Sequence, residues 1–158
     1  MDLANQITNI LTDELSNISD KSTGIVFLEK LKYTLIEKIE TNIKNKNFNE
    51  FENINQTKIE INKRKINFKL IISSSPKIYL NTKIKANLLV ICLKESLGVN
   101  IQNQNNKKNF TFNCIPFTGI VLPIDTKCSL NLNKKSVILE IYYEDDFLDI
   151  ENTKKNII

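Results

Sequence analysis

The chain has 158 residues, a net charge of +4 and a hydrophobic fraction of 41%. A chain of this length and composition fits one globular domain with a core of its own, which excludes an intrinsically disordered protein. Histidine is absent from the sequence and no glycine-rich phosphate loop occurs, so catalytic and metal sites that depend on either are excluded as well.

Two amphipathic helices are predicted at the start of the chain. Apolar residues at steps of three and four predict a helix from Leu3 to Ile18, with Asp2 placed to cap it. After Gly24 a second apolar stripe, from Leu28 to Ile43, predicts a longer helix. We expect this second stripe to pack on a sheet, and pairing with a second copy of itself is the alternative.

The hydrophobic period then changes to two, which is the period of β-strands. A hairpin is predicted that places Ile59 and Ile61 opposite the apolar residues of segment 66–72. Short strands follow at 77–80, 87–93, 97–102, 109–115, 119–123, 128–132 and 136–143, and the connections between them are rich in Asn, Lys, Asp or Pro. About nine short strands without intervening helices predict an antiparallel sandwich or barrel.

The organisation expected is a single domain in three parts. Residues 1–47 form a helical segment, residues 48–146 form the β-barrel, and residues 147–158 form a C-terminal tail with too little pattern to place.

Positive charge is concentrated in the middle of the chain. Residues 51–110 carry a net charge of +8, and the segments on either side carry −2 each. An anionic ligand is favoured if the cations of this region share one face; those to test are Lys58, Lys63, Arg64, Lys83 and Lys85. If they scatter, they serve solubility. Nucleic acid is not an expected partner, because the chain has a single Arg for bidentate base contacts.

The cysteines and the N-terminus indicate a cytoplasmic protein, or a virion-associated one if the chain comes from a phage. Cys92 and Cys114 lie in apolar segments as small buried hydrophobes. Three cysteines without paired spacing favour a reducing compartment. Residues 1–16 lack the features of a signal peptide, and no apolar run reaches the ~20 residues of a membrane helix, so no membrane partner is expected.

Two segments carry a family resemblance. NLLVICLKESLGVNIQ (87–102) reads as strand, turn and strand, and GIVLPIDTKCSLNL (119–132) as a glycine, a Pro-x-Asp turn and a strand. Their order over about residues 66–143 resembles the cupin family of double-stranded β-helix barrels. The resemblance places Glu95 or Ser96 at a glycine turn, Asp125 where the second motif has glycine, and Cys128 where it has a metal-binding histidine.

The resemblance implies a mainly β fold, an antiparallel double-stranded β-helix or jelly-roll-like barrel with an N-terminal pair of α-helices. Other sandwiches and jelly rolls are the alternatives. The family's remaining metal-ligand positions fall near Asn81, Lys83 and Asn87, which are not effective ligands, so neither metal nor cofactor is expected. Asn81, Lys83, Asn87 and Cys128 are instead the predicted lining of a ligand pocket in the barrel mouth.

No catalytic residue is predicted. Lys127 precedes Cys128, but neighbouring residues of a strand point to opposite faces, so the lysine does not activate the thiol. Glu140 is the best candidate for an inward-facing acid and equally fits a solvent-exposed position. Phe110 and Phe112 share one strand face and are expected in the core, whereas Tyr142 and Tyr143 are expected on opposite faces of their strand.

Three functions stay open. The first is a non-enzymatic, cupin-like module without a metal site that binds a small or anionic molecule or serves in assembly, as a homodimer or higher homo-oligomer. The alternative is a phage or viral structural jelly-roll protein that acts through protein–protein contacts; the abundance of Ile, Asn and Lys suits an A/T-rich genome of either origin. A third, an enzyme using a carboxylate or tyrosine alone, requires a polar cavity around such a residue.

Overall fold

The computed structural model describes residues 3–18, 21–44, 54–61, 64–73, 75–102 and 108–145. Two helices come first, α1 (Leu3–Asn17) and α2 (Gly24–Ile43). The strands are β1 (Ile54–Ile61), β2 (Arg64–Ile72), β3 (Lys77–Lys83), β4 (Asn87–Lys94), β5 (Leu97–Gln102), β6 (Asn109–Cys114), β7 (Thr118–Leu122), β8 (Lys127–Leu132) and β9 (Val137–Asp145). The predicted helices, hairpin and strand order are confirmed. Asp2, the boundary at residue 47 and the tail 147–158 lie outside the described residues.

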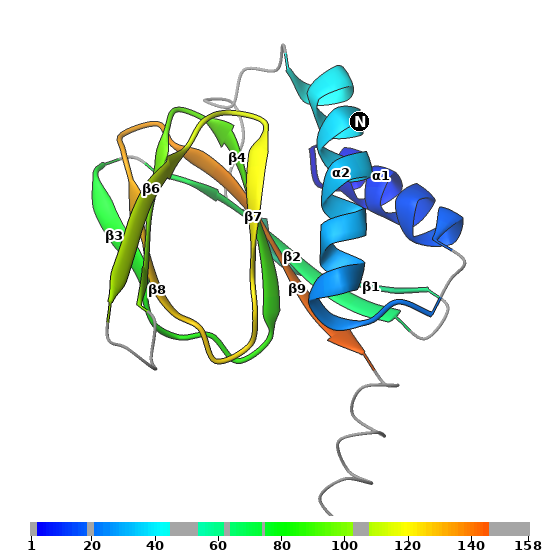
Figure 1. Ribbon diagram of the computed structural model, residues 1–158. Helices are drawn as coiled ribbons and strands as arrows, with labels where there is room; N and C mark the ends of the chain where they lie inside the picture. Colours follow the sequence, from blue (N-terminus) through cyan, green and yellow to red (C-terminus); the bar gives the residue numbers. More distant parts are fainter. Residues whose placement is uncertain are drawn as a thin grey trace, which may run out of the picture.

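The strands form two antiparallel sheets (Figure 1). The first sheet has the order β1-β2-β9-β4-β7, and the second has the order β3-β8-β5-β6. From β2 onward the chain changes sheet at every step except between β5 and β6, which form a hairpin. This is the strand order of a jelly roll, the architecture that cupins share. The predicted cupin-like β fold with N-terminal helices is therefore confirmed by topology.

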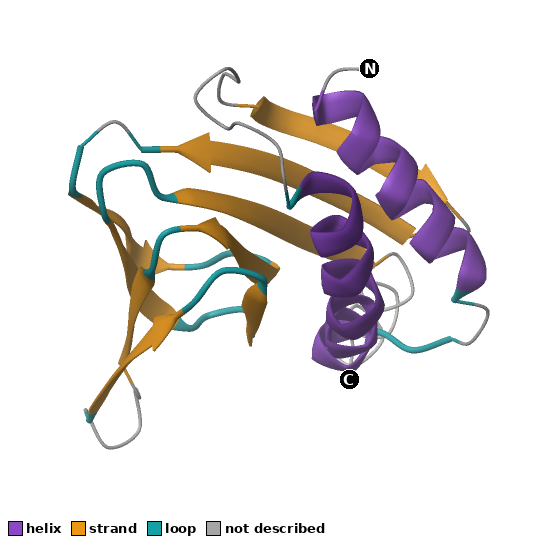
Figure 2. Cartoon of the chain, turned by 90° about the horizontal axis from the view of Figure 1, so that it is seen from above, coloured by secondary structure: helices purple, strands orange, loops and turns teal. Residues whose placement is uncertain are grey.

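Both helices cover the outer face of the first sheet, as Figure 2 shows. Helix α2 packs against β4, β7 and β9, and α1 packs against α2 and β1. The second apolar stripe thus packs on a sheet, as expected. Neither described helix combines the length and the apolar character needed to cross a membrane.

The first sheet lies between two hydrophobic cores. Leu31 and Leu35 of α2 meet Phe68 and Leu139 in the core between the helices and the sheet. The other core fills the barrel between the two sheets. Strand β4 contributes to both, and seven consecutive residues of it are buried. This explains its unbroken apolar sequence, since a strand covered on both faces has no polar side.

Two barrel turns have the backbone conformation that the family resemblance implies. Glu95, at the expected glycine turn, has φ = 60°, and Asp125, at the expected Pro-x-Gly position, has φ = 70°. Both values lie in the left-handed region that glycine adopts most easily. Both turns therefore have the left-handed backbone that the family resemblance implies, although neither position is a glycine.

Candidate functional site

Four polar side chains meet on the barrel-facing side of the first sheet. Asn67 and Lys69 lie on β2, directly opposite Tyr142 and Glu140 of β9 in the antiparallel register. Alternation along each strand places all four on the face opposite to the helices, because Phe68 and Ile141 between them belong to the helix-side core. We call these four residues the polar cluster.

The polar cluster is held together by contacts between its own side chains. Glu140 is fully buried, and the hydroxyl group of Tyr142 donates a hydrogen bond of 3.3 Å to its Oε2 atom. The Lys69 ammonium lies 5.3 Å from the centroid of the Tyr142 ring, within cation–π range. A buried carboxylate needs such polar and cationic neighbours, because its desolvation would otherwise cost several kcal/mol. Glu140 therefore faces the barrel and not solvent. The sequence was compatible with either position.

Cys128 is buried in the barrel core on β8, within electrostatic reach of Glu140. Burial raises the pKa of the Cys128 thiol, and the charge of Glu140 raises it further. Cys92 and Cys114 are buried as expected, and burial raises the pKa of Cys92 to about 12. All three thiols are protonated core groups at neutral pH. A nucleophilic cysteine requires a thiolate, so none of the three meets this condition.

A hollow of about 520 Å³ lies beside the polar cluster, where β1 and β2 run together. Its lining residues are Lys58, Ile59, Glu60, Lys65, Ile66 and Asn67, and we call it the β1–β2 hollow. The side chains of Lys58, Glu60 and Lys65 are exposed. The Oδ1 atom of Asn67 is buried and has no hydrogen-bond partner among the described residues. Asn67 thus belongs both to the hollow and to the polar cluster, and it offers an unused acceptor at their boundary.

The centre of the barrel is filled by apolar side chains. Those buried between the sheets include Leu88, Val90, Leu97, Val99, Leu122, Leu130, Leu132 and Ile138. Interiors packed in this way have little space for a guest molecule. This packing argues against a ligand pocket in the middle of the barrel.

The structure does not test the four residues predicted to line a pocket as one set, because the side chains of Asn81 and Lys83 lie outside the description. Cys128 is buried in the barrel core and also lines a hollow of about 210 Å³, together with Asn100, Gln102, Asn109, Lys127 and Ser129. Asn87 is buried, and its Oδ1 atom accepts a hydrogen bond of 2.8 Å from the backbone N–H of Ile124, so it fixes the turn after β7. Asn81 and Lys83 lie in β3, where the backbone of Lys83 pairs with that of Lys127; their side chains are outside the description.

The basic residues of the middle region do not form one face. Arg64 is buried on the helix side of the sheet, where its guanidinium carbon lies 4.1 Å from the centroid of the Phe27 ring. Lys58 points to the opposite side, into the β1–β2 hollow. Lys63 lies outside the described residues. The cations that do share a face with Lys58 are Lys65 and Lys69, which sequence inspection did not single out because the pairing of β1 with β2 decides their side.

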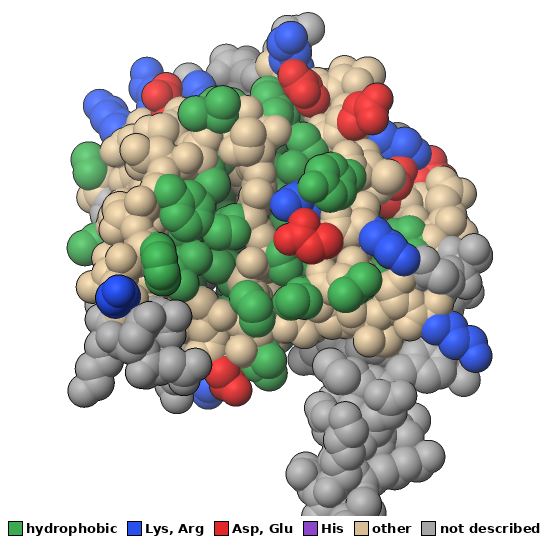
Figure 3. Space-filling model, viewed as in Figure 1, with side chains coloured by type: hydrophobic (Ala, Val, Ile, Leu, Met, Phe, Trp, Pro, Cys, Tyr) green, Lys and Arg blue, Asp and Glu red, His purple; other side chains and the backbone are tan. Residues whose placement is uncertain are grey.

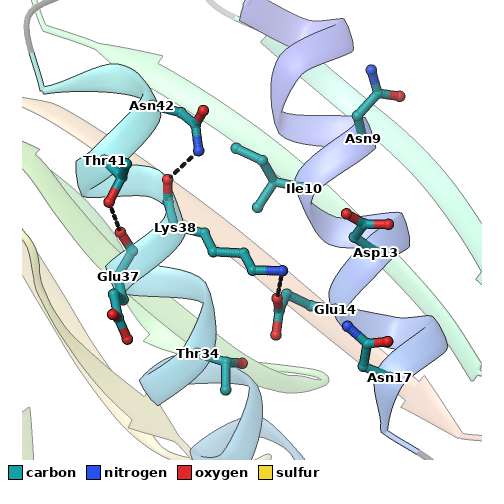
Figure 4. A pocket seen from close by; sticks show the side chains of 10 residues that line it. All are labelled: Asn9, Ile10, Asp13, Glu14, Asn17, Thr34, Glu37, Lys38, Thr41 and Asn42. Carbon is teal, nitrogen blue, oxygen red and sulfur yellow. Dashed lines mark hydrogen bonds and ion pairs between the residues drawn. The ribbon is translucent and has the colours of Figure 1, made fainter.

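A second, larger hollow of about 720 Å³ lies between α1 and α2 (Figure 4). Lys38 reaches across it from α2 and forms an ion pair of 2.5 Å with the buried Glu14 of α1. Thr41 and Asn42 donate hydrogen bonds to carbonyl groups of their own helix. Burial raises the pKa of Glu14, but hydrogen bonds from Lys38 and Thr34 outweigh it and leave that pKa below its ordinary value. The Lys38–Glu14 ion pair thus joins the two helices, while Thr41 and Asn42 bond within α2.

The residues present do not fit the metal site of the cupin family. By the resemblance, its ligand positions fall at or near Asn81, Lys83, Asn87 and Cys128, of which Cys128 alone carries a strong donor atom. Within the ranges that the structure describes, no group of three or more Cys, Asp or Glu side chains lies together as a metal site would require.

No family model matches the chain, and no curated protein matches it in sequence. Solved structures similar to it include a cupin superfamily protein from Desulfitobacterium hafniense, with 9% identity, a TM-score of 0.43, and coverage of 60% of this chain and 79% of that one. An oxalate decarboxylase from Bacillus subtilis has 10% identity and a TM-score of 0.46 over 62% of this chain and 28% of its own. Drosophila melanogaster CENP-C has 9% identity and a TM-score of 0.45 over 56% of this chain and 76% of its own.

Proposed function

We propose that the protein is a non-enzymatic binding module on a cupin-like jelly roll and that it takes a small anionic molecule in the β1–β2 hollow. The observation that carries this proposal is the meeting of Lys58, Lys65 and Asn67 around one hollow, where the Asn67 Oδ1 atom is buried without a hydrogen-bond partner in the part of the chain that the structure describes. A buried acceptor without a partner costs free energy, and a ligand donor would recover it.

The size and charges of the hollow define the class of ligand. A volume of about 520 Å³ is in the range of small-molecule sites. The two lysines supply ammonium groups for a carboxylate or phosphate, and the Asn67 oxygen accepts a hydrogen bond from a hydroxyl group of the same molecule. Glu60, across the strand pair from Lys65, limits the net positive charge and favours a ligand that carries donors as well as an anion. A hydroxycarboxylate has this chemistry.

Binding without chemistry fits the rest of the molecule. The hollow is lined by neither Glu140 nor Tyr142, so the protonatable groups of the polar cluster lie behind Asn67. The three thiols are protonated and buried, and the barrel centre is occupied by aliphatic side chains. These features support a surface site for recognition over a buried site for catalysis.

Isothermal titration calorimetry with L-malate and with inorganic phosphate tests the proposal. Wild-type protein should bind malate more tightly than phosphate, because malate adds a hydroxyl donor for Asn67. The double variant Lys58→Ala/Lys65→Ala should lose affinity for malate by about 100-fold, since it removes two charge-assisted contacts.

A matched control separates a site from general attraction. Lys85→Ala/Lys134→Ala removes the same charge from exposed turn positions and should leave malate affinity unchanged. Equal losses in both double variants, or a wild-type protein that binds neither anion at millimolar concentration, would refute the proposed function.

A further inference from the structure

The second sheet has an outer face on the side of the barrel away from the two described helices (Figure 2). Leu97 and Val99 of β5, Cys114 of β6 and Leu130 of β8 belong to the barrel core, so the residues that alternate with them point outward. The outward positions of these three strands are Gly98, Asn100, Gln102, Asn109, Thr111, Asn113, Lys127, Ser129 and Asn131, and we call them the polar face.

The polar face is almost free of charge, with Lys127 as its one ionic residue. The whole chain contains 21 Lys and 23 Asn, so composition alone predicts about as many lysines as asparagines on an exposed sheet surface. The polar face instead has four Asn and one Lys. Exposed positions of β1 and β2, by contrast, carry Lys58, Glu60 and Lys65. The polar face therefore differs from the other solvated strands of this protein.

The hollow of about 210 Å³ lies at one end of the polar face, and we call it the β5–β8 hollow. In the antiparallel register Gln102 lies between Asn109 of β6 and Lys127 of β8. One row further along the sheet, Asn100 is paired with Ser129. All five of these residues line the hollow, so its wall consists of two neighbouring rows of outward side chains.

The lining amides have no structural role in the described part of the fold. Asn87 and Asn133 form side-chain hydrogen bonds that hold turns of the barrel. Within the described residues, no hydrogen bond or ion pair engages the side chains of Asn100, Gln102 or Ser129, although all three are partly buried. Partly buried polar groups that the protein leaves unused present their donors and acceptors to whatever occupies the hollow.

The next row of the polar face limits the length of the hollow. A Cβ atom at Gly98 would lie 3.2 Å from the Cβ atom of Asn131 and 3.6 Å from the Oδ1 atom of Asn113. The two asparagines therefore lean over the glycine and occupy the space above it. A hollow of about 210 Å³ is also smaller than the sites of drug-sized ligands. Both observations indicate a ligand of one small ring with its substituents.

The chemistry of the lining favours a ligand rich in hydroxyl groups. Each amide, like the Ser129 hydroxyl, carries a donor and an acceptor, and a ligand hydroxyl group has the same two properties. An anion would have the amide oxygens of Asn100, Gln102 and Asn109 close to its charge, and a cation would meet the Lys127 ammonium. A nucleobase is held by stacking on aromatic side chains, and the lining of the hollow contains none.

We propose that the β5–β8 hollow binds one neutral monosaccharide unit through the amides of Asn100, Gln102 and Asn109. Lys127 and Ser129 supply further hydrogen bonds to its hydroxyl groups. This site is separate from the anion site on β1 and β2, because the two hollows lie on different sheets and share no lining residue. Either one can therefore fail its test without the other.

A nuclear magnetic resonance titration of the wild-type protein with D-glucose, D-galactose and D-mannose, one at a time, tests the proposal. At least one sugar should shift the side-chain amides of Asn100, Gln102 and Asn109 saturably at millimolar concentration. Its affinity should not depend on ionic strength, because the ligand carries no charge. L-malate, phosphate and adenosine should leave these amides unshifted.

The double variant Asn100→Ala/Gln102→Ala should weaken binding of that sugar by about 10-fold, since it removes two sets of hydrogen bonds. The control, Asn17→Ala/Asn42→Ala, removes two exposed amides of the α1–α2 hollow and should keep the wild-type affinity. The wild-type titration locates the site even if a variant fails to fold. Absence of a saturable shift with all three sugars, shifts caused by malate, phosphate or adenosine instead, or equal losses in both double variants would overturn the proposal.

Discussion

Glu95 and Phe117 have the same left-handed backbone, with φ = 60°, but different surroundings. The side chain of Glu95 is exposed at the turn between β4 and β5. Phe117, in the turn before β7, packs against the core between the helices and the first sheet. A side chain in this conformation costs roughly 1–2 kcal/mol, which packing offsets at Phe117 and nothing comparable offsets at Glu95.

Glu95→Gly should raise the free energy of unfolding by roughly 0.5–1 kcal/mol, because relief of strain exceeds the added chain entropy of glycine. Phe117→Gly, its matched comparison, should lower that free energy by about 2 kcal/mol through lost packing. Urea denaturation of both variants measures the two values. A destabilised Glu95→Gly protein would show that the glutamate side chain contributes more than its backbone costs.

At the scale of elements, one ion pair joins the two helices. Glu14 of α1 is buried and Lys38 of α2 contacts it, so the contact fixes how α1 lies along α2 (Figure 4). The folded state holds the pKa of Glu14 below its ordinary value of 4.5. A carboxyl group whose pKa is lower in the folded state than in the unfolded state stabilises the fold at pH values above its unfolded pKa. This contribution is lost as the pH falls through the folded pKa.

Glu14→Gln should therefore lower the free energy of unfolding by about 1 kcal/mol at pH 7, and the difference from wild type should shrink as the pH falls below 4.5. Denaturation curves at several pH values measure this. Glu37→Gln, on an exposed residue of the same groove, serves as the control and should differ little from wild type at any pH. A Glu14→Gln difference that persists unchanged in acid would contradict the role of the ion pair.

The elements themselves were predictable, because a period of two and the turn residues mark each strand locally. The faces of the strands were harder to predict. Glu140 stands in VILEIYY, which is apolar on both sides, and a strand that is apolar on both sides is covered on both sides. That pattern was the available signal that Glu140 is buried whichever way it points.

On the scale of the whole molecule, the jelly roll separates three regions with different properties. Its centre is packed, its β1–β2 side carries the hollow with Lys58 and Lys65, and its β6–β7 side carries residues 109–124, a run without charge that shows apolar side chains on its surface (Figure 3). The sequence could not predict this arrangement, since the hollow arises from the pairing of β1 with β2, which brings residues 58–60 next to residues 65–67. Phe110 was predicted in the core, and that prediction is wrong: its side chain is 52% exposed near the start of β6, an edge strand of the second sheet.

The central claim is that recognition takes place in the β1–β2 hollow and not inside the barrel. Nuclear magnetic resonance with L-malate tests it most directly through the side-chain amide of Asn67. A saturable shift of that amide, together with the backbone amides of Lys58 and Lys65 and with no shift at Leu130 or Ile138, is the predicted result. Saturable shifts confined to Leu130, Ile138 and their barrel neighbours, with Asn67 unchanged, would contradict it.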